Sequence, residues 1–193
     1  MRSEEIIEEA VRYVRKLFEG NSDGHGPDHT LRVYRTAMCL ADSEPACDRF
    51  VVALAALLHD ADDDKLFRTE NNGNARAFLE SRQVDPETAD RICDTVNAVS
   101  FRKNRDRQPE TPEAKIVQDA DRLDALGAVG IARTFAYGGC HGRDPEASIG
   151  HFHDKLLLLR DRMNTPAARR LADDRHRFME AFLEEWRRET EGE

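Results

Sequence analysis

Apolar side chains recur at every third or fourth position along most of this chain, and this spacing predicts α-helices. The first two apolar stripes consist of Ile6, Ala10, Val14 and Leu17, and of Leu31, Tyr34, Met38 and Ala41. Sustained alternation of apolar and polar residues, which would predict strands, is nearly absent. The pattern therefore favours an all-α protein, a bundle of roughly seven to nine helices.

Residues that favour helix ends mark the expected boundaries of these helices. Thr111-Pro112 and Thr165-Pro166 each combine an N-cap residue with proline at the first helical position. The third helix continues through His59-Asp60 and is apolar on nearly every side, so it should be the buried central helix. The other expected starts are Ser3, Pro27, Pro45 and Ser148, and further helical patterns cover residues 72–82, 86–100 and 127–139.

Length and charge restrict the classes of function. The 193 residues are interpreted as one domain, 1–193, with a core at about 21–130 and the helices of 148–189 packed on it. Lys and Arg total 29 against 38 Asp and Glu, a net charge of −9, which argues against a nucleic-acid partner. An anionic substrate would have to be attracted by local cations or by a bound metal.

The sequence also favours a cytoplasmic protein without a membrane partner. The longest apolar run, Phe50 to Leu58, is too short to span a bilayer. The acidic N-terminal segment lacks the apolar region of a signal peptide. The four cysteines form no CxxC pair, and we expect them to be reduced thiols.

The most apolar segment of the chain ends in two titratable residues, His59 and Asp60. Such groups are costly beside a buried helix unless they are paired or ligated. An imidazole and a carboxylate together suit Mn²⁺, Fe²⁺ or Zn²⁺. Alone, however, the pair is better explained as a helix end, where histidine caps carbonyl groups and aspartate is solvated.

His29 and Asp119 are the two residues that could complete such a site. His29 lies near the start of a helix and shares an inward face with Val33 and Ala37. Asp119 shares the face of the apolar residues of its helix, where an unpaired carboxylate would require a cation. The alternative partner of Asp119 is Arg122, three residues later. On the same helical wheel, Asp121 points away from this face.

Three segments in this order, DHTLRVYRTA, ALAALLHDADDDK and EAKIVQDADRLDALGAVGIAR, resemble the H…HD…D signature of the HD superfamily. The segment HFHDKLLLLRDRMNTPAARRLADDRHRFMEAFLEEW resembles a subgroup of stand-alone bacterial and archaeal HD hydrolases that includes nucleotide pyrophosphohydrolases. The resemblance covers residues 5–188, nearly the whole chain.

The resemblance implies one divalent metal ion, with manganese expected and iron, magnesium, nickel, cobalt or zinc as alternatives. Its implied ligands are His29, His59, Asp60 and Asp119. Asp63, three residues after the HD aspartate, would orient or deprotonate a water molecule, and Lys65 would neutralise charge on the phosphates. The residues implied to contact the substrate are Lys65, Arg122, and the H-x3-K pair His151 and Lys155.

The implied reaction is the hydrolysis of nucleoside triphosphates to monophosphate and pyrophosphate by a metal-activated water molecule. The implied partner is thus a small phosphorylated metabolite, a nucleotide. Two alternatives stay open: hydrolysis of alarmones or 5′-nucleotides, and a non-catalytic module that binds a metal or a nucleotide. The sequence does not distinguish a monomer from a homodimer.

Overall fold

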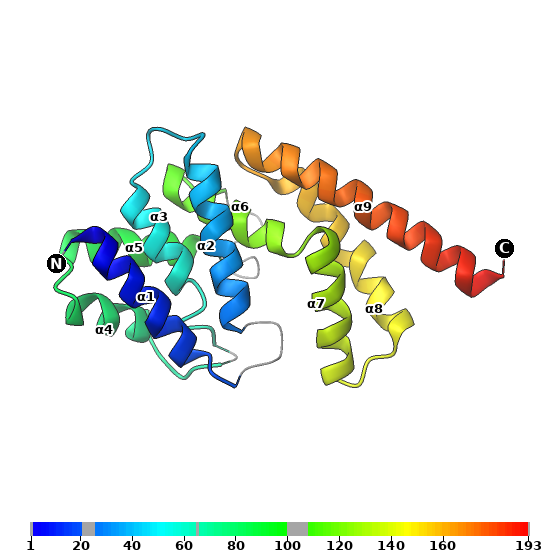
Figure 1. Ribbon diagram of the computed structural model, residues 1–193, viewed down its shortest axis with the longest axis horizontal. Helices are drawn as coiled ribbons and strands as arrows, with labels where there is room; N and C mark the ends of the chain where they lie inside the picture. Colours follow the sequence, from blue (N-terminus) through cyan, green and yellow to red (C-terminus); the bar gives the residue numbers. More distant parts are fainter. Residues whose placement is uncertain (1, 21–25, 65, 100–107, 193) are drawn as a thin grey trace. The chain divides into compact units, whose positions relative to one another are not determined.

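The computed structural model describes residues 2–20, 26–64, 66–99 and 108–192, and these residues contain helices but no strand. The α-helices are α1 (Ser3–Leu17), α2 (Pro27–Ala41), α3 (Arg49–Leu58), α4 (Gly73–Ser81), α5 (Pro86–Val99), α6 (Pro112–Asp124), α7 (Gly127–Cys140), α8 (Pro145–His151) and α9 (Pro166–Glu191) (Figure 1). A π-helix, η1 (Phe152–Leu156), and a 3-10 helix, η2 (Leu157–Arg162), join α8 to α9. The predicted all-α class with seven to nine helices is confirmed.

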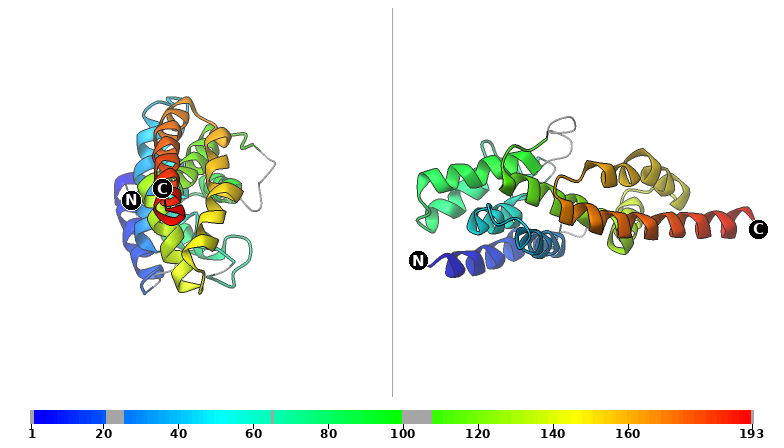
Figure 2. Two further views of the ribbon diagram at one scale, coloured as in Figure 1. Left: turned by 90° about the vertical axis from the view of Figure 1, so that its right-hand side faces the viewer. Right: turned by 90° about the horizontal axis from the view of Figure 1, so that it is seen from above.

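Contacts between Cα atoms divide the chain into two compact units, Met1–Asp121 and Arg122–Glu193. In the first unit, α3 packs against α1, α2 and α5, and α4 packs against α5. The right-hand view of Figure 2 shows α3 between α1 and α5. Every residue from 51 to 58 is buried, so the expectation of a buried central helix is confirmed.

The start of α3 is fixed by the carboxylate of Asp48. Its Oδ1 accepts hydrogen bonds from the backbone N–H groups of Phe50 and Val51, at 3.0 and 3.3 Å. The Asp48 backbone N–H in turn donates to Oε1 of Glu113 on α6, at 2.7 Å. The predicted start at Pro45 is wrong, because the capping carboxylate that satisfies the first free N–H groups lies three residues later.

Three other helix starts were predicted from capping residues. Oγ1 of Thr111 accepts from the N–H of Ala114, and Oγ1 of Thr165 accepts from the N–H of Ala168, so both Thr-Pro starts are confirmed. The predicted start at Ser148 is wrong, since α8 already begins at Pro145. Its N-cap is Asp144, whose Oδ1 accepts from the N–H of Ala147 at 2.7 Å.

The second unit has its own core of helices and aromatic rings. In it, α7 packs against α8 and α9, and η2 packs against α9. Ring centroids within a cluster of Phe135, Phe152, Phe182 and Trp186 lie 5.6 to 6.1 Å apart. None of the described helices of either unit combines the length and the apolar character needed to cross a membrane.

Two glycines of α7 should respond differently to replacement by alanine. A Cβ at Gly130 would lie 2.2 Å from the backbone oxygen of Ala125, whereas a Cβ at Gly139 would meet nothing within 4 Å. We expect Gly130→Ala to lower the free energy of unfolding by about 1–3 kcal/mol through overpacking. Gly139→Ala should leave it unchanged or slightly raised, because alanine favours the helix. Urea denaturation followed by circular dichroism measures both, and equal midpoints would contradict the packing described for α7.

Candidate metal centre

Two histidine side chains from different helices meet inside the first unit. His29 belongs to the first turn of α2, and His59 directly follows the last residue of α3. Their Nε2 atoms lie 3.2 Å apart, and both side chains are almost completely buried. The expectation that His29 faces inward is confirmed.

The orientation of the His59 ring is set by its second nitrogen. Nδ1 lies 2.8 Å from the carbonyl oxygen of Ala56, one turn earlier. A carbonyl oxygen only accepts, so Nδ1 carries the proton of this hydrogen bond. In the neutral ring the lone pair is then on Nε2, the atom that faces His29. A histidine that binds a metal commonly has one nitrogen donating to the protein in this way.

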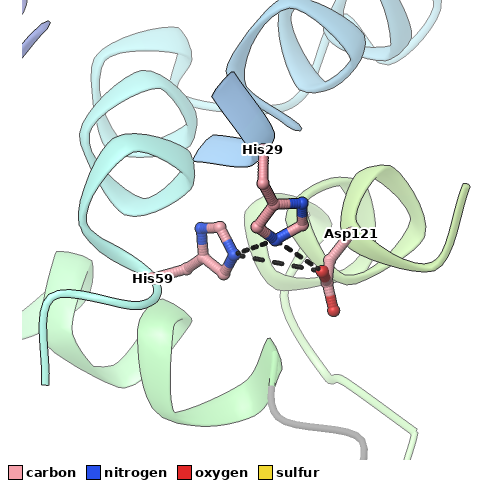
Figure 3. A group of neighbouring side chains, drawn as sticks. All are labelled: His29, His59 and Asp121. Carbon is pink, nitrogen blue, oxygen red and sulfur yellow. Dashed lines mark hydrogen bonds and ion pairs between the residues drawn. The ribbon is translucent and has the colours of Figure 1, made fainter. Parts of the chain in front are cut away.

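Two carboxylates approach the same point. Oδ2 of Asp60 lies 3.3 Å from Nε2 of His59 and 3.5 Å from Nε2 of His29. Oδ1 of Asp121, on α6, lies 3.5 Å from Nε2 of His29 and 3.9 Å from Nε2 of His59. Figure 3 shows His29, His59 and Asp121 pointing toward one another. Ligand atoms held about 2.1 Å from one cation lie about 3.0 to 3.4 Å apart, close to these separations.

The electrostatics of this group favour a positive charge at its centre. Burial alone would lower the pKa of His59, but the negative charges of Asp60 and Asp121 outweigh burial and raise this pKa to about 9. Burial likewise would raise the pKa of Asp121, but the hydrogen bond from His29 and the charge of His59 lower it. The field that favours a proton on His59 would favour a metal cation for the same reason.

The donor set therefore fits a divalent metal ion. The ligand atoms of His29, His59 and Asp121 all lie within 4.8 Å of one another, and Asp60 adds a second carboxylate. Two imidazole nitrogens with carboxylate oxygens suit Mn²⁺, Fe²⁺ and Zn²⁺. His29, His59 and Asp60 are thus brought together as the sequence predicted.

The aspartate that α6 directs at the histidines is Asp121. The expectation that Asp121 points away from the site is wrong, because its Oδ1 lies 3.5 Å from Nε2 of His29. Asp119 is completely buried, and residues two positions apart do not share a helix face. The role of Asp119 as a ligand stays a prediction, and the distances of Asp121 from His29 and His59 make Asp121 the candidate ligand from α6.

Two predicted catalytic residues lie in the segment after Asp60. The backbone N–H of Asp63 donates to the carbonyl oxygen of Asp60 at 3.1 Å, and Asp63 is half-buried. Lys65 lies outside the described residues. The catalytic roles of both residues stay predictions.

The other predicted substrate residues belong to the second unit. Nη1 of Arg122 donates a hydrogen bond to the backbone oxygen of Arg162. Burial, and then the positive charges of Lys155 and Arg143, lower the pKa of His151. The substrate contacts predicted for Arg122, His151 and Lys155 stay predictions.

The order and the geometry of these residues agree with a comparison to known families. A model of the HD domain matches residues 27–126, a span that contains both histidines and also Asp60, Asp63, Asp119 and Asp121. The chain belongs to the HD domain family. The resemblance found in the sequence is thereby confirmed at the level of the family.

Relatives of this HD protein are similar over its whole length. The uncharacterized protein YpgQ of Bacillus subtilis is 38% identical over 200 residues, which cover 100% of this chain and 97% of YpgQ. The crystal structure of YpgQ in complex with ADP has a TM-score of 0.82 and covers 95% of this chain and 97% of that chain, at 38% identity. An HD-superfamily hydrolase from Bacillus thuringiensis has a TM-score of 0.81 at 38% identity, with 100% of both chains covered.

The two aspartates of α6 can be separated by matched substitutions. We expect Asp121→Asn to weaken Mn²⁺ binding by at least about tenfold, because it removes a charged donor beside His29 and His59. Asp119→Asn, two residues away, should bind Mn²⁺ with an affinity within about threefold of the wild type. Isothermal titration calorimetry of metal-stripped protein measures both affinities. The reverse order, with Asp119→Asn the weaker binder, would return the ligand role to Asp119.

Proposed function

We propose that this HD protein is a metal-dependent phosphohydrolase that converts nucleoside triphosphates to monophosphate and pyrophosphate. The observation that carries the proposal is the convergence of His29, His59, Asp60 and Asp121. The two imidazole Nε2 atoms lie 3.2 Å from each other and 3.3 to 3.9 Å from the carboxylate oxygens. Membership of the HD family and the similarity to an HD-superfamily hydrolase support it further.

These four residues would hold one divalent cation, with Mn²⁺ as the proposed ion. When bound, such a cation supplies Lewis-acid polarisation of a phosphoryl group and a water molecule of lowered pKa. The burial of the histidines excludes bulk water from one side of the group, which strengthens its electrostatic interactions. Asp121, whose side chain is 28% exposed, is the most accessible of the four.

Asp63 is the proposed general base. Its backbone oxygen accepts hydrogen bonds from the N–H groups of Leu66 and Phe67, both at 2.9 Å. These bonds fix the main chain from which the carboxylate projects, three residues after Asp60. A carboxylate held in this way can orient a water molecule and accept its proton. Lys65 is proposed to neutralise the charge that develops on the phosphates.

A nucleotide is the proposed substrate because a related protein binds one. YpgQ, which is 38% identical to this chain, was crystallised in complex with ADP. His151 and Lys155 are proposed to contact the phosphates. Basic side chains gather at this place, since the positive charges of Lys155 and Arg143 act on His151. Such local positive charge is what a chain of net charge −9 needs to attract an anionic substrate.

The proposal is tested by incubating purified protein and Mn²⁺ with a panel of ribo- and deoxyribonucleoside triphosphates. We expect monophosphate and pyrophosphate in equal amounts, resolved by ion-exchange chromatography. Asp60→Asn should lower kcat roughly 10³-fold, because metal catalysis contributes several kcal/mol to transition-state stabilisation.

Asp90→Asn is the matched control for Asp60→Asn. Asp90 forms an ion pair with Arg76 on the surface, at 2.8 Å, so its loss should change kcat by less than about twofold. Release of orthophosphate alone from a triphosphate would mean cleavage of the terminal phosphate to leave a diphosphate, and it would overturn the proposed reaction. Orthophosphate released only from added 5′-monophosphates would point to a 5′-nucleotidase. Pyrophosphate release from guanosine tetraphosphate alone would point to an alarmone hydrolase. Nucleotide binding without turnover under any divalent metal would support a binding module.

A further inference from the structure

Asp62, two residues after Asp60, caps the N-terminus of a different helix. Its Oδ1 accepts hydrogen bonds from Oγ1 of Thr69 at 2.6 Å and from the backbone N–H of Asn74 at 2.8 Å. Its Oδ2 accepts from the backbone N–H of Ala75 at 3.0 Å. Asn74 and Ala75 lie in the first turn of α4, where backbone N–H groups have no partner within the helix.

The side chain at the N-cap position of α4 does not cap this helix and instead forms a hydrogen bond to α5. Asn72 occupies the N-cap position in a left-handed conformation, with φ of 57°, and its side chain makes no capping hydrogen bond. Its Nδ2 instead donates to the backbone oxygen of Cys93 on α5, at 3.3 Å. The N-terminus of α4 thus takes its cap from the segment that follows the metal-binding residues.

A second hydrogen bond joins the same two segments. Nδ2 of Asn74 donates to the backbone oxygen of Ala61 at 2.7 Å. The backbone N–H of Ala61 donates to the oxygen of Leu58, the last residue of α3, at 3.0 Å. Residues 59–62 are therefore attached to α3 on one side and to α4 on the other. Because α4 packs against α5 and α5 packs against α3, both attachments lead to one scaffold.

We propose that Asp62 is a positioning residue whose cap on α4 holds the turn that presents Asp60 to His29 and His59. The inference rests on the metal site of the proposed function. In this proposal Asp62 acts through Asp60 and is not itself a ligand, since its two oxygens already accept three hydrogen bonds from Thr69 and α4.

A carboxylate suits this position for two physical reasons. Hydrogen bonds to an ionised acceptor are stronger than those to a neutral one. A negative charge at the N-terminus of a helix is also stabilised by the helix dipole. Asparagine has a similar shape but one acceptor oxygen, and alanine has none. The cap should therefore weaken in the order Asp62, Asp62→Asn, Asp62→Ala.

The test compares Asp62→Ala with Asp85→Ala, since both remove a helix-capping carboxylate. Asp85 precedes α5 and accepts from the N–H of Thr88 at 3.0 Å. Mn²⁺ affinity is measured by isothermal titration calorimetry and stability by urea denaturation. We expect Asp62→Ala to weaken Mn²⁺ binding roughly tenfold, and Asp62→Asn to weaken it less. Asp85→Ala should lose stability while its Mn²⁺ affinity stays unchanged.

Two results would overturn the inference. One is an Asp62→Ala variant that is folded and binds Mn²⁺ as the wild type does. The other is an equal loss of affinity in Asp85→Ala, which would mean that any lost cap acts through general stability. If Asp62→Ala does not fold, Thr69→Val is tested instead. This variant removes one of the three hydrogen bonds to Asp62, and we expect it to lower the Mn²⁺ affinity a few-fold. Unchanged affinity in Thr69→Val would then count against the proposal.

Parallel assays separate this inference from the proposed function. If the wild type binds Mn²⁺ but hydrolyses no nucleotide, the proposed reaction fails while the affinities still decide the role of Asp62. If the wild type binds no divalent metal, amide hydrogen exchange of the metal-free protein decides it. Exchange at Ala61 and Asp63 should be faster in Asp62→Ala than in Asp85→Ala, and equal rates would overturn the proposal.

Discussion

Four ligand atoms, two imidazole nitrogens and two carboxylate oxygens, lie 3.2 to 3.9 Å from their neighbours in a largely buried group. The two carboxylates of this group repel each other, since the charge of Asp60 acts to raise the pKa of Asp121, and a positive charge between them would offset that repulsion. The same negative charges raise the pKa of His59 to about 9, against the opposing effect of burial. A divalent cation would supply the positive charge, because it attracts both carboxylates and accepts both nitrogen lone pairs. The arrangement of α2, α3 and α6 is best understood as what holds these atoms together.

The surrounding helices hold this group in place by burying residues 51–58 of α3. Eight consecutive apolar residues, 51–58, leave no polar group on the sides of α3, so its chemistry is confined to its ends. At one end Asp48 caps the helix and is bound by Glu113 of α6. At the other end His59 and Asp60 enter the site, and the cap that Asp62 provides to α4 fixes the segment that follows. The stability of the unit and the geometry of the site thus depend on the same elements.

The sequence predicted the helical class, the buried helix and three of the four converging residues, because each has a local signal. Thr111 and Thr165 were found as caps because the capping hydrogen bond spans only three residues. The apolar stripe of α6 predicts an inward face that contains Asp119 and leaves out Asp121, so the sequence pattern favours Asp119 as the ligand. A ligand that must reach both a buried metal and the substrate lies at the border of that stripe, as the exposure of Asp121 shows. Asp62 carries no local signal, since its partners are 7 to 13 residues away.

The match to the HD domain ends at residue 126. This boundary separates the residues of the candidate metal site from the residues of the second unit that are predicted to contact the substrate. The converging ligands lie inside the matched span, and they determine which kind of bond a metal could help to break. His151 and Lys155 lie outside it, in the second unit, where burial and then the positive charges of Lys155 and Arg143 lower the pKa of His151. The same catalytic group can serve different substrates on one fold, so the residues that select a substrate must be sought outside the shared signature.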